Sequence, residues 1–413
     1  MTSLAPSPSL APLVAPGPKL DAAHLARYAR HLPLPGVGPE GQRRLAAARV
    51  LVVGAGGLGS PALQYLAAAG VGTLGVVDDD VVDVSNLQRQ VVHGTADVGR
   101  PKVESARDRI ADLAPDVEVV AHPVRLTPEN VLEIVGGYDV VLDGADNFPT
   151  RYLVSDAAEI LGVPVVWGAI HQFDGQVAVF WGAPVLADAT GEETRTRGVT
   201  YRDVFPVPPP PGTVPDCATG GVLGALCGTV GSVMATEAVK LITGAGTTLL
   251  GRIAVYDALE LSWRQLAVRP DPTREPVAEL LADDAAYAAF CGLPAPVGGS
   301  AVAAGSGLGP ASMSAVDAAA LLAGGSPVAL VDVREGWEVQ ALPVAGATVS
   351  PSGAFLGGGD AAASAVAALP TDRPVLLVCA AGARSARVAD VARAAGVDAR
   401  SVEGGAPALL LAV

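Results

Sequence analysis

The sequence predicts an α/β fold in which helices cover a mainly parallel sheet. Half of the residues are hydrophobic, mostly Ala, Val and Leu, and only 4% are aromatic. This composition suits helices packed on Val-rich parallel strands better than an aromatic-rich β-sandwich. Between about residues 20 and 290, short apolar runs also alternate with helical patterns, and such alternation is typical of right-handed β-α-β crossovers.

The expected elements can be placed in order along the first half of the chain. Residues 163–167 and 176–181 are apolar runs with no helix between them, so we expect an antiparallel extension of the sheet. Residues 206–211 contain five prolines. Because each ring fixes φ and restricts the preceding residue, this segment should be an extended crossing loop. The earlier expected strands are residues 50–53, 74–77, 117–121 and 140–142, and the expected helices are residues 60–69 and 102–113.

Length and composition divide the chain further. A chain of 413 residues exceeds what one core usually holds, which predicts two domains. Residues 1–19 lack the pattern of a secretory signal and are expected to form a disordered tail before a first domain at residues 20–292. Residues 293–311 have the composition of a flexible linker. A second α/β domain is expected at residues 312–413, with strands at 328–331 and 375–378 and a helix at 386–395.

Charge and cysteine spacing exclude several classes of function. A net charge of -15 argues against nucleic acid as a partner. Residues 217–236 approach membrane-spanning length but contain five glycines, so we expect a buried helix and no membrane association. The four cysteines show no disulfide framework and no Cys-x-x-Cys zinc knuckle, which suits a reducing cytoplasm.

A glycine-rich turn follows the first expected strand and predicts a phosphate-binding loop. Such glycines let backbone N–H groups face a phosphate at the start of the next helix. Asp78 closes the second strand, where an acid can accept hydrogen bonds from ribose hydroxyls. This much fits a nicotinamide cofactor as well as ATP, and a merely tight turn is the structural alternative. The glycines are Gly54, Gly56, Gly57 and Gly59.

Polar residues after Asp78 favour a triphosphate. Asn86, Arg89 and Lys102 have no evident use in a dehydrogenase, whereas Arg89 and Lys102 could neutralise the charge that develops as pyrophosphate leaves. Taken singly, each is more often a solvated surface charge. Asp146 and Asn147 follow the strand at 140–142, where a carboxylate can hold Mg²⁺, although a helix N-cap is the alternative.

A second candidate site lies near the far end of the sequence. Cys379 follows an apolar strand and opens a loop that includes Gly382, Arg384 and Ser385 before the expected helix. Backbone N–H groups and a helix N-terminus lower a thiol pKa and stabilise a persulfide anion, and Arg384 adds positive charge. The ordinary alternative is a buried structural cysteine.

Several motifs follow one another in order along residues 20–290, namely Arg27–His31, Val53–Gly59, Asp78–Asp80, Ser85–Gln90, Asp143–Asn147 and Arg151. With these motifs the region resembles the MoeB and ThiF group of adenylating enzymes, which activate small ubiquitin-like sulfur-carrier proteins. By this resemblance the fold is Rossmann-like, and Gly57, Asp78, Arg89, Lys102 and Asp146 contact ATP or its Mg²⁺. Asp80 is expected in the same site, and Arg30 should reach the nucleotide of the opposite subunit of a homodimer.

Two cysteine patterns refine this resemblance. Many members hold a structural zinc with two Cys-x-x-Cys pairs, which the stretches near Tyr201 and residues 269–291 lack, so we predict no zinc. Cys217 matches a cysteine that in relatives can form a covalent link to the carrier, and a helix-start cysteine is the alternative. Cys227 and Cys291 are expected to be structural.

Residues 312–413 resemble a rhodanese domain. Leu330–Glu335 matches its early strand, and Cys379–Ser385 matches its persulfide loop. The sequence departs from the usual Ile-Pro-Gly-Ala at Val344–Ala347 and lacks the customary closing aromatic after Gly405. With these departures the domain is still expected to fold, but efficient sulfur transfer is less certain.

Both resemblances together predict one two-step enzyme. ATP adenylates the C-terminal glycine carboxylate of a carrier ending in Gly-Gly, and a Cys379 persulfide loaded by a separate cysteine desulfurase then displaces AMP to give a thiocarboxylate. Two other functions remain open on the residues alone. One is an NAD-dependent oxidoreductase, and the other is a carrier-binding scaffold or adenylating enzyme with an inactive rhodanese tail.

Overall fold

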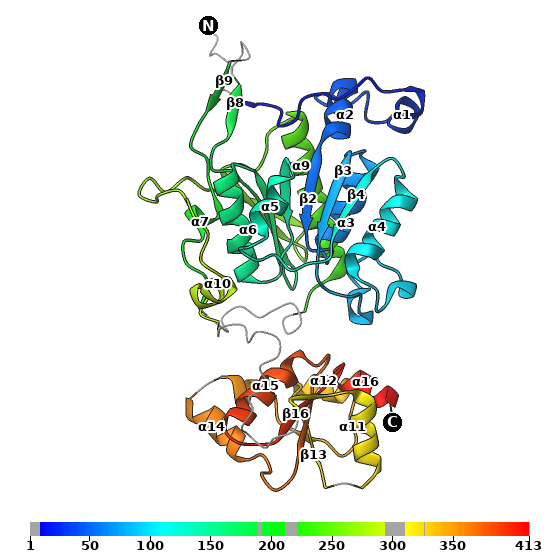
Figure 1. Ribbon diagram of the computed structural model, residues 1–413, viewed down its shortest axis with the longest axis vertical. Helices are drawn as coiled ribbons and strands as arrows, with labels where there is room; N and C mark the ends of the chain where they lie inside the picture. The colour runs from blue at the N-terminus through cyan, green and yellow to red at the C-terminus, as the bar shows by residue number, and fades with distance from the viewer. Residues whose placement is uncertain are drawn as a thin grey trace. The chain divides into compact units, whose positions relative to one another are not determined.

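The computed structural model describes residues 9–187, 192–210, 221–293, 310–325, 327–357 and 359–412. The chain divides into two compact units, Met1–Pro296 and Val297–Val413 (Figure 1). This division falls within residues 293–311, the expected linker, most of which lies outside the described residues. The two units are described separately below.

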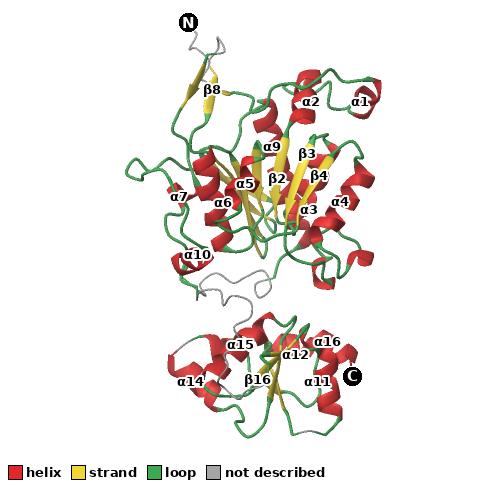
Figure 2. Cartoon of the chain, in the orientation of Figure 1, coloured by secondary structure: helices red, strands yellow, loops and turns green. Residues whose placement is uncertain are grey.

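The first unit is built on an eight-stranded sheet with helices on its faces (Figure 2). The strands lie in the order β11-β10-β7-β6-β5-β2-β3-β4, and the five strands from β6 to β4 run parallel to one another. The predicted mainly parallel α/β fold is confirmed. The strands are β2 (Arg49–Val53), β3 (Thr73–Val77), β4 (Glu118–His122), β5 (Val140–Asp143), β6 (Val165–His171), β7 (Asp174–Phe180), β10 (Arg252–Asp257) and β11 (Ser262–Ala267).

The antiparallel side of the sheet begins at a tight turn. Strands β6 and β7 pair from Val165 opposite Phe180 to His171 opposite Asp174, as the missing helix between them predicts. β6 runs four residues past its predicted end at residue 167, because Gln172 turns the chain with a φ of 51° only after His171. β7 then pairs with β10 and β10 with β11, both antiparallel.

Alternation along the central strand creates one hydrophobic core on each face of the sheet. Val50 and Val52 pack with the helices α3 and α9, whereas Leu51 and Val53 pack on the opposite face with helix α6. Because both faces are covered, β2 and β3 are nearly continuous runs of buried apolar residues. The helices of this unit are α1 (Ala22–Arg27), α2 (Gly38–Ala47), α3 (Gly59–Ala68), α4 (Lys102–Leu113), α5 (Val131–Gly136), α6 (Phe148–Leu161), α7 (Tyr201–Val204), α9 (Gly224–Thr243) and α10 (Asp284–Phe290).

Helix α9 is long and apolar enough to cross a membrane by length and composition, with a mean hydropathy of 1.3. It is instead a core helix that packs on α3, β6 and β7. Gly231 permits this approach, because a Cβ there would lie 2.5 Å from the Leu58 carbonyl oxygen. The helix begins at Gly224, later than the predicted apolar stretch, since residues 221–223 form an extended entry that pairs at Val222 with Gln172.

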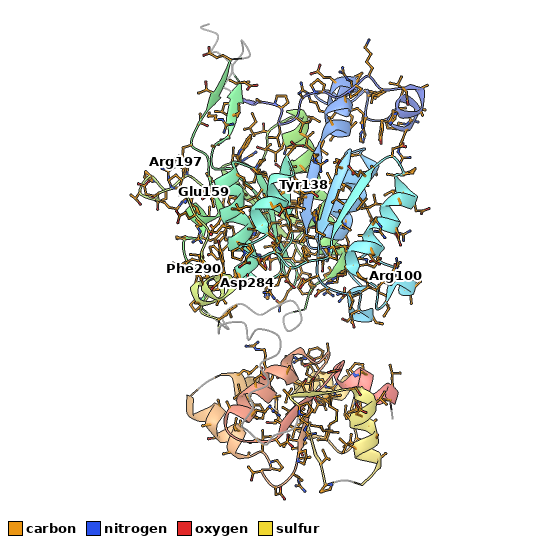
Figure 3. The ribbon with its side chains drawn as sticks, viewed as in Figure 1. Arg100, Tyr138, Glu159, Arg197, Asp284 and Phe290 are labelled. Carbon is orange, nitrogen blue, oxygen red and sulfur yellow. The ribbon has the colours of Figure 1, made fainter. Side chains whose placement is uncertain are left out.

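A buried ion-pair cluster, the α6 brace, ties two later segments to α6. Arg274 donates to Asp203 at 2.8 Å and to Glu159, labelled in Figure 3, also at 2.8 Å. Arg202 of α7 makes two hydrogen bonds to Asp156 at 2.6 and 2.8 Å. These contacts occupy the stretches near Tyr201 and residues 269–291, where cysteine pairs are missing from the sequence. The α6 brace comprises Asp156, Glu159, Thr200, Arg202, Asp203 and Arg274.

The second unit has a five-stranded, wholly parallel sheet in the order β12-β16-β15-β13-β14. Strand β15 (Val375–Val378) ends directly before Cys379, as predicted. Helix α15 (Ala383–Ala394) begins three residues before its predicted start, because Gly382 adopts a φ of +101° and ends the loop. The other elements are β12 (Ser312–Met313), α11 (Ala315–Ala323), β13 (Ala329–Asp332), α12 (Gly336–Ala341), β14 (Thr348–Val349), α13 (Gly353–Leu356), α14 (Gly359–Ala367), β16 (Ala399–Val402) and α16 (Gly405–Ala412).

Candidate active sites

The glycine loop between β2 and α3 has the backbone that its sequence predicts. Gly54 adopts a φ of +88°, and its N–H donates to the Val77 carbonyl oxygen at 2.8 Å. At Gly59 a Cβ would lie 1.8 Å from the Gly54 carbonyl oxygen, so only glycine fits. At Gly57 a Cβ would lie 2.9 Å from Cys227 Sγ. The loop is therefore pressed between β2 and α9, with its backbone at the start of α3.

Asp78 holds the glycine loop from the neighbouring strand. One carboxylate oxygen accepts a hydrogen bond from Ala55 N–H at 2.8 Å, and the other accepts from Asp80 N–H at 2.9 Å. Burial raises the pKa of Asp78, while Lys102 and these hydrogen bonds act in the opposite direction. Asp78 thus fixes the loop as well as lying where a ribose could bind.

Lys102 and Asp80 form an ion pair next to Asp78. Lys102 Nζ donates to Asp80 Oδ2 at 2.7 Å. The Lys102 side chain is 7% exposed, whereas that of Asp80 is 68% exposed. A buried cation whose partner lies largely in water can exchange that partner for an anionic ligand at small cost. The two predicted residues therefore do meet at the edge of the site.

Arg89 reaches the glycine loop through its aliphatic stem. Its Cγ lies 3.6 Å from the position of a Cβ on Gly57, and its Nη1 donates to the Ser85 carbonyl oxygen at 3.0 Å. Asn86 ends the short 3-10 helix η1 (Val84–Asn86) and accepts a hydrogen bond from Asp83 N–H at 3.3 Å. Arg89 is placed beside the phosphate loop, while Asn86 shapes the turn that carries it.

Two buried residues at this site were not predicted to be functional. Gln90 is 4% exposed, and within the described part of the chain its Oε1 has no hydrogen-bond partner. His93 contacts the Ala55 carbonyl oxygen at 3.0 Å and Ser105 Oγ at 2.8 Å, and burial lowers its pKa. A neutral His93 therefore links the glycine loop to α4, the helix that begins at Lys102.

The loop after β5 presents Asp146 to solvent. Asn147 Oδ1 accepts from Thr150 N–H at 2.9 Å, so Asn147 is the N-cap of α6. The Ala145 peptide before them is held at both ends: its N–H donates to Asp143 Oδ1 at 2.9 Å, and its carbonyl oxygen accepts from Arg151 Nε at 3.0 Å. Burial raises the pKa of Asp143 to about 6, and the Arg151 charge opposes this effect.

The remaining predicted residues of the first unit stand apart from the loop. Arg30 lies in an exposed turn after α1, and among the described residues no hydrogen bond or ion pair joins it to the glycine loop. Cys217 lies outside the described residues. Burial raises the pKa of Cys291 to about 11, which suits the structural role expected for this cysteine.

In the second unit, the Cys379 sulfur is surrounded by hydrogen-bond donors. Gly382 N–H lies 3.0 Å and Ser385 Oγ 3.4 Å from Sγ. Burial acts to raise the pKa of Cys379, but hydrogen bonds from Ser385, Ala381 and Gly382 together lower it below the ordinary thiol value. The Cys379 carbonyl oxygen accepts from Ala406 N–H at 2.7 Å, which anchors the loop to α16. This arrangement stabilises a sulfur anion.

The loop is shorter than predicted, because Arg384 and Ser385 lie in the first turn of α15. Arg384 makes two hydrogen bonds to Glu338 of α12, one of them 2.8 Å long between Nη1 and Oε2. Glu338 was not predicted as part of the site. Its distance of 46 residues along the chain from Arg384 leaves no local signal, although the two residues carry the opposite charges that such a pair needs.

Comparison with known proteins identifies a family and several relatives of this chain. The ThiF family model matches residues 28–277. The probable adenylyltransferase/sulfurtransferase MoeZ of Mycobacterium tuberculosis is 49% identical over 97% of this chain and 96% of that protein. The sulfur carrier protein adenylyltransferase of Thermus thermophilus is 57% identical over 65% of this chain and 97% of that protein. The SAMP-activating enzyme E1 of Haloferax volcanii is 53% identical over 61% of this chain and 88% of that protein.

Solved structures agree on the fold. A crystal structure of E. coli MccB with MccA-N7isoASN matches with a TM-score of 0.52 and 18% identity, over 62% of this chain and 75% of that chain. This likeness concerns the fold alone. Because the family model spans more than half of the chain, and the M. tuberculosis relative is 49% identical over nearly its whole length, the chain belongs to the ThiF family.

Proposed function

We propose that this enzyme adenylates the C-terminal glycine of a small ubiquitin-like sulfur carrier and then converts that carboxylate into a thiocarboxylate. The observation that carries the proposal is the presence, on one chain, of a glycine loop flanked by Arg89 and Lys102 and of a thiolate-stabilising loop at Cys379. Relatives named adenylyltransferase/sulfurtransferase and sulfur carrier protein adenylyltransferase support it.

In the first step, a carboxylate oxygen of the carrier attacks the α-phosphorus of ATP. The bond between the α- and β-phosphates breaks, which gives an acyl-adenylate and pyrophosphate. Lys102 and Arg89 stabilise the charge that develops on the phosphates. The exposed carboxylate of Asp146 lies at the carboxyl end of β5 and would hold Mg²⁺ bound to the nucleotide, where the ion neutralises phosphate charge.

In the second step, the terminal sulfur of a Cys379 persulfide attacks the acyl carbon and AMP leaves. The product is an acyl disulfide between the carrier and Cys379. Attack of the Cys217 thiolate on the Cys379 sulfur releases the carrier thiocarboxylate and leaves a Cys217–Cys379 disulfide, which a cellular thiol reduces. A cysteine desulfurase supplies the persulfide sulfur.

Four further features complete the proposal. The chain acts as a homodimer in which Arg30 of the partner subunit reaches the nucleotide, which fits the exposed position of Arg30 in its own chain. It requires no structural zinc, since the α6 brace joins the segments concerned. It works in the cytoplasm. Its rhodanese domain is active, which the hydrogen bonds from Gly382 N–H and Ser385 Oγ to the Cys379 sulfur support.

The test is pyrophosphate exchange with a panel of carriers ending in Gly-Gly, followed by the intact mass of each carrier after a sulfur donor is added. We expect exchange with at least one carrier and a mass gain equal to the replacement of one oxygen by sulfur. The gain should disappear in Cys379→Ala while exchange persists. Absence of exchange with every carrier, despite ATP binding, would contradict the activating role, and an unchanged mass gain in Cys379→Ala would contradict the sulfur step.

A further inference from the structure

The Cys379 sulfur has a hydroxyl neighbour that is itself held by a second hydroxyl. Ser385 Oγ lies 3.4 Å from Cys379 Sγ and 2.8 Å from Ser401 Oγ. Both serine side chains also reach the Gly382 carbonyl oxygen, at 2.9 Å from Ser385 and 3.2 Å from Ser401. Ser401 lies in β16 opposite Leu377 of β15, so it belongs to the sheet and not to the loop.

Burial limits the partners of these two hydroxyl groups. Ser385 is 0% and Ser401 3% exposed. A buried hydroxyl without a hydrogen bond costs free energy, so both groups are expected to use the acceptors within reach. Those acceptors are the Cys379 sulfur, the Gly382 carbonyl oxygen and the two serine oxygens themselves.

Only one arrangement of the two serine hydroxyl protons brings a proton to the Cys379 sulfur without leaving two oxygen lone pairs in contact. Each serine hydroxyl donates once. If Ser401 donates to Ser385, then Ser385 can donate to Cys379, and the Gly382 carbonyl oxygen still accepts from Ala386 N–H at 3.0 Å. If Ser385 instead donates to Ser401 or to Gly382, the sulfur receives neither hydroxyl proton. If both serines point away from each other, two oxygen lone pairs face across the 2.8 Å contact.

We propose that Ser401 is a positioning residue for sulfur transfer, which donates to Ser385 and thereby directs the Ser385 hydroxyl onto the anionic sulfur of Cys379. The same direction serves the thiolate and the persulfide formed from it. Successive hydrogen bonds polarise one another, so the bond from Ser401 also strengthens the bond from Ser385. This inference rests on the proposed function of the loop, because it concerns the sulfur anion that this function uses.

The test is a pH titration of the full chain, followed by the ultraviolet absorbance of thiolate. The curve of Cys379→Ala is subtracted, so that the other cysteines cancel. Ser385→Ala is expected to raise the Cys379 pKa by about one pH unit, because a hydrogen bond to a charged group is lost. Ser401→Ala should raise it by roughly 0.3 pH unit through lost polarisation. In the Ser385→Ala background, Ser401→Ala should cause no further rise.

Two variants control for general loosening of the sheet. Ser312→Ala removes a hydroxyl from the neighbouring strand β12 that bonds to Glu403, and it should leave the Cys379 pKa unchanged. Ser401→Thr keeps the hydroxyl and should retain the native value. If Ser401→Ala fails to fold, Ser401→Gly also removes the hydroxyl without adding a titrating group, and it replaces Ser401→Ala in the double-variant comparison.

Two results would overturn the proposal. One is an unchanged Cys379 pKa in Ser401→Ala when Ser385→Ala raises it. The other is an equal rise from Ser401→Ala in both backgrounds, which is what a merely structural role produces. The titration needs no carrier, ATP or sulfur donor, so its outcome is independent of whether the chain thiolates a carrier. A failed proposed function and a failed role for Ser401 are therefore distinguishable.

Discussion

At the nucleotide site the protein's own acceptors hold the cationic side chains, whereas in the sulfur loop the protein holds the reacting atom itself. Lys102 pairs with the exposed Asp80, and Arg89 donates to a backbone carbonyl oxygen. The Cys379 sulfur already receives hydrogen bonds from Gly382 and Ser385. To bind a nucleotide, Lys102 and Arg89 would have to exchange these partners, while the sulfur loop is organised before any ligand arrives.

Removal of the sulfur gives the largest expected effect and tests whether the two regions are separable. In Cys379→Ala, carrier thiolation should fall to background, because no persulfide can form. Pyrophosphate exchange should stay within about twofold of the wild type, since sites that share no contacts usually behave additively. Intact mass and exchange rates measure the two outcomes. A parallel loss of exchange would show that the regions are coupled.

Lys102→Ala tests the exchange of partners at the nucleotide site. The rate of pyrophosphate exchange should fall by about 100-fold or more, because one group that stabilises transition-state charge is lost. Arg100→Ala is the matched control. Arg100, labelled in Figure 3, is a nearby cation that is bound to Asp97 and Asp108 on the surface. We expect Arg100→Ala to leave the exchange rate nearly unchanged; an equal loss in both variants would point to general electrostatics instead.

Asp203→Ala tests whether the α6 brace supports the first unit alone. Loss of this buried partner of Arg274 should lower the free energy of unfolding by about 3 kcal/mol. Asp108→Ala, which breaks an exposed pair with Arg100, should cost roughly 0.5 kcal/mol at most. Urea unfolding, monitored in each unit by hydrogen exchange, measures the change in unfolding free energy for both variants. A comparable loss of protection in the second unit would contradict independent stability of the two units.

Gly57→Ala tests how close packing against Cys227 affects the glycine loop. The added Cβ would lie 2.9 Å from Cys227 Sγ, and overpacking of this kind costs about 1 to 2 kcal/mol. If this strain opposes ATP binding, the dissociation constant for ATP should rise about tenfold. Isothermal calorimetry measures it. Cys227→Ala should restore most of the affinity in the double variant, and failure to do so would assign the effect to the backbone.

The lowered pKa of Cys379 gives the smallest effect, a pH dependence of stability. Because the folded-state pKa lies below the ordinary thiol value of 9.0, the stabilisation is fully present above pH 9 and is lost as the pH falls through the folded-state value. The difference in unfolding free energy between the wild type and Cys379→Ser should therefore grow with pH in this window. A difference that is flat with pH would contradict a lowered pKa.

Local sequence signals were enough to place the backbone of both sites. The spacing of Gly54 and Gly59 after an apolar run predicted the turn, because positive φ and close approach leave glycine as the fitting residue. Strand alternation likewise predicted the parallel sheet. The start of α15 was predicted three residues late, since Gly382 turns the chain with a φ of +101° and the helix begins directly after it.

The supporting side chains could not be predicted in the same way. His93, Glu338 and Ser401 act through partners 12 to 46 residues away, and those contacts exist only after the strands and helices have packed. Asn147 shows the converse case. The sequence allowed both a ligand contact and a helix N-cap, and its hydrogen bond to Thr150 N–H identifies the cap.

The contact between Gly57 and Cys227 has a consequence for oxidative chemistry. Cys227 is fully buried, and its sulfur lies only 2.9 Å from the position of a Cβ on Gly57, so a further heavy atom does not fit between the sulfur and the glycine loop. Oxygen or sulfur added to this thiol would displace the loop. Burial therefore shields this thiol, and with it the packing of the glycine loop, in a molecule that handles reactive sulfur.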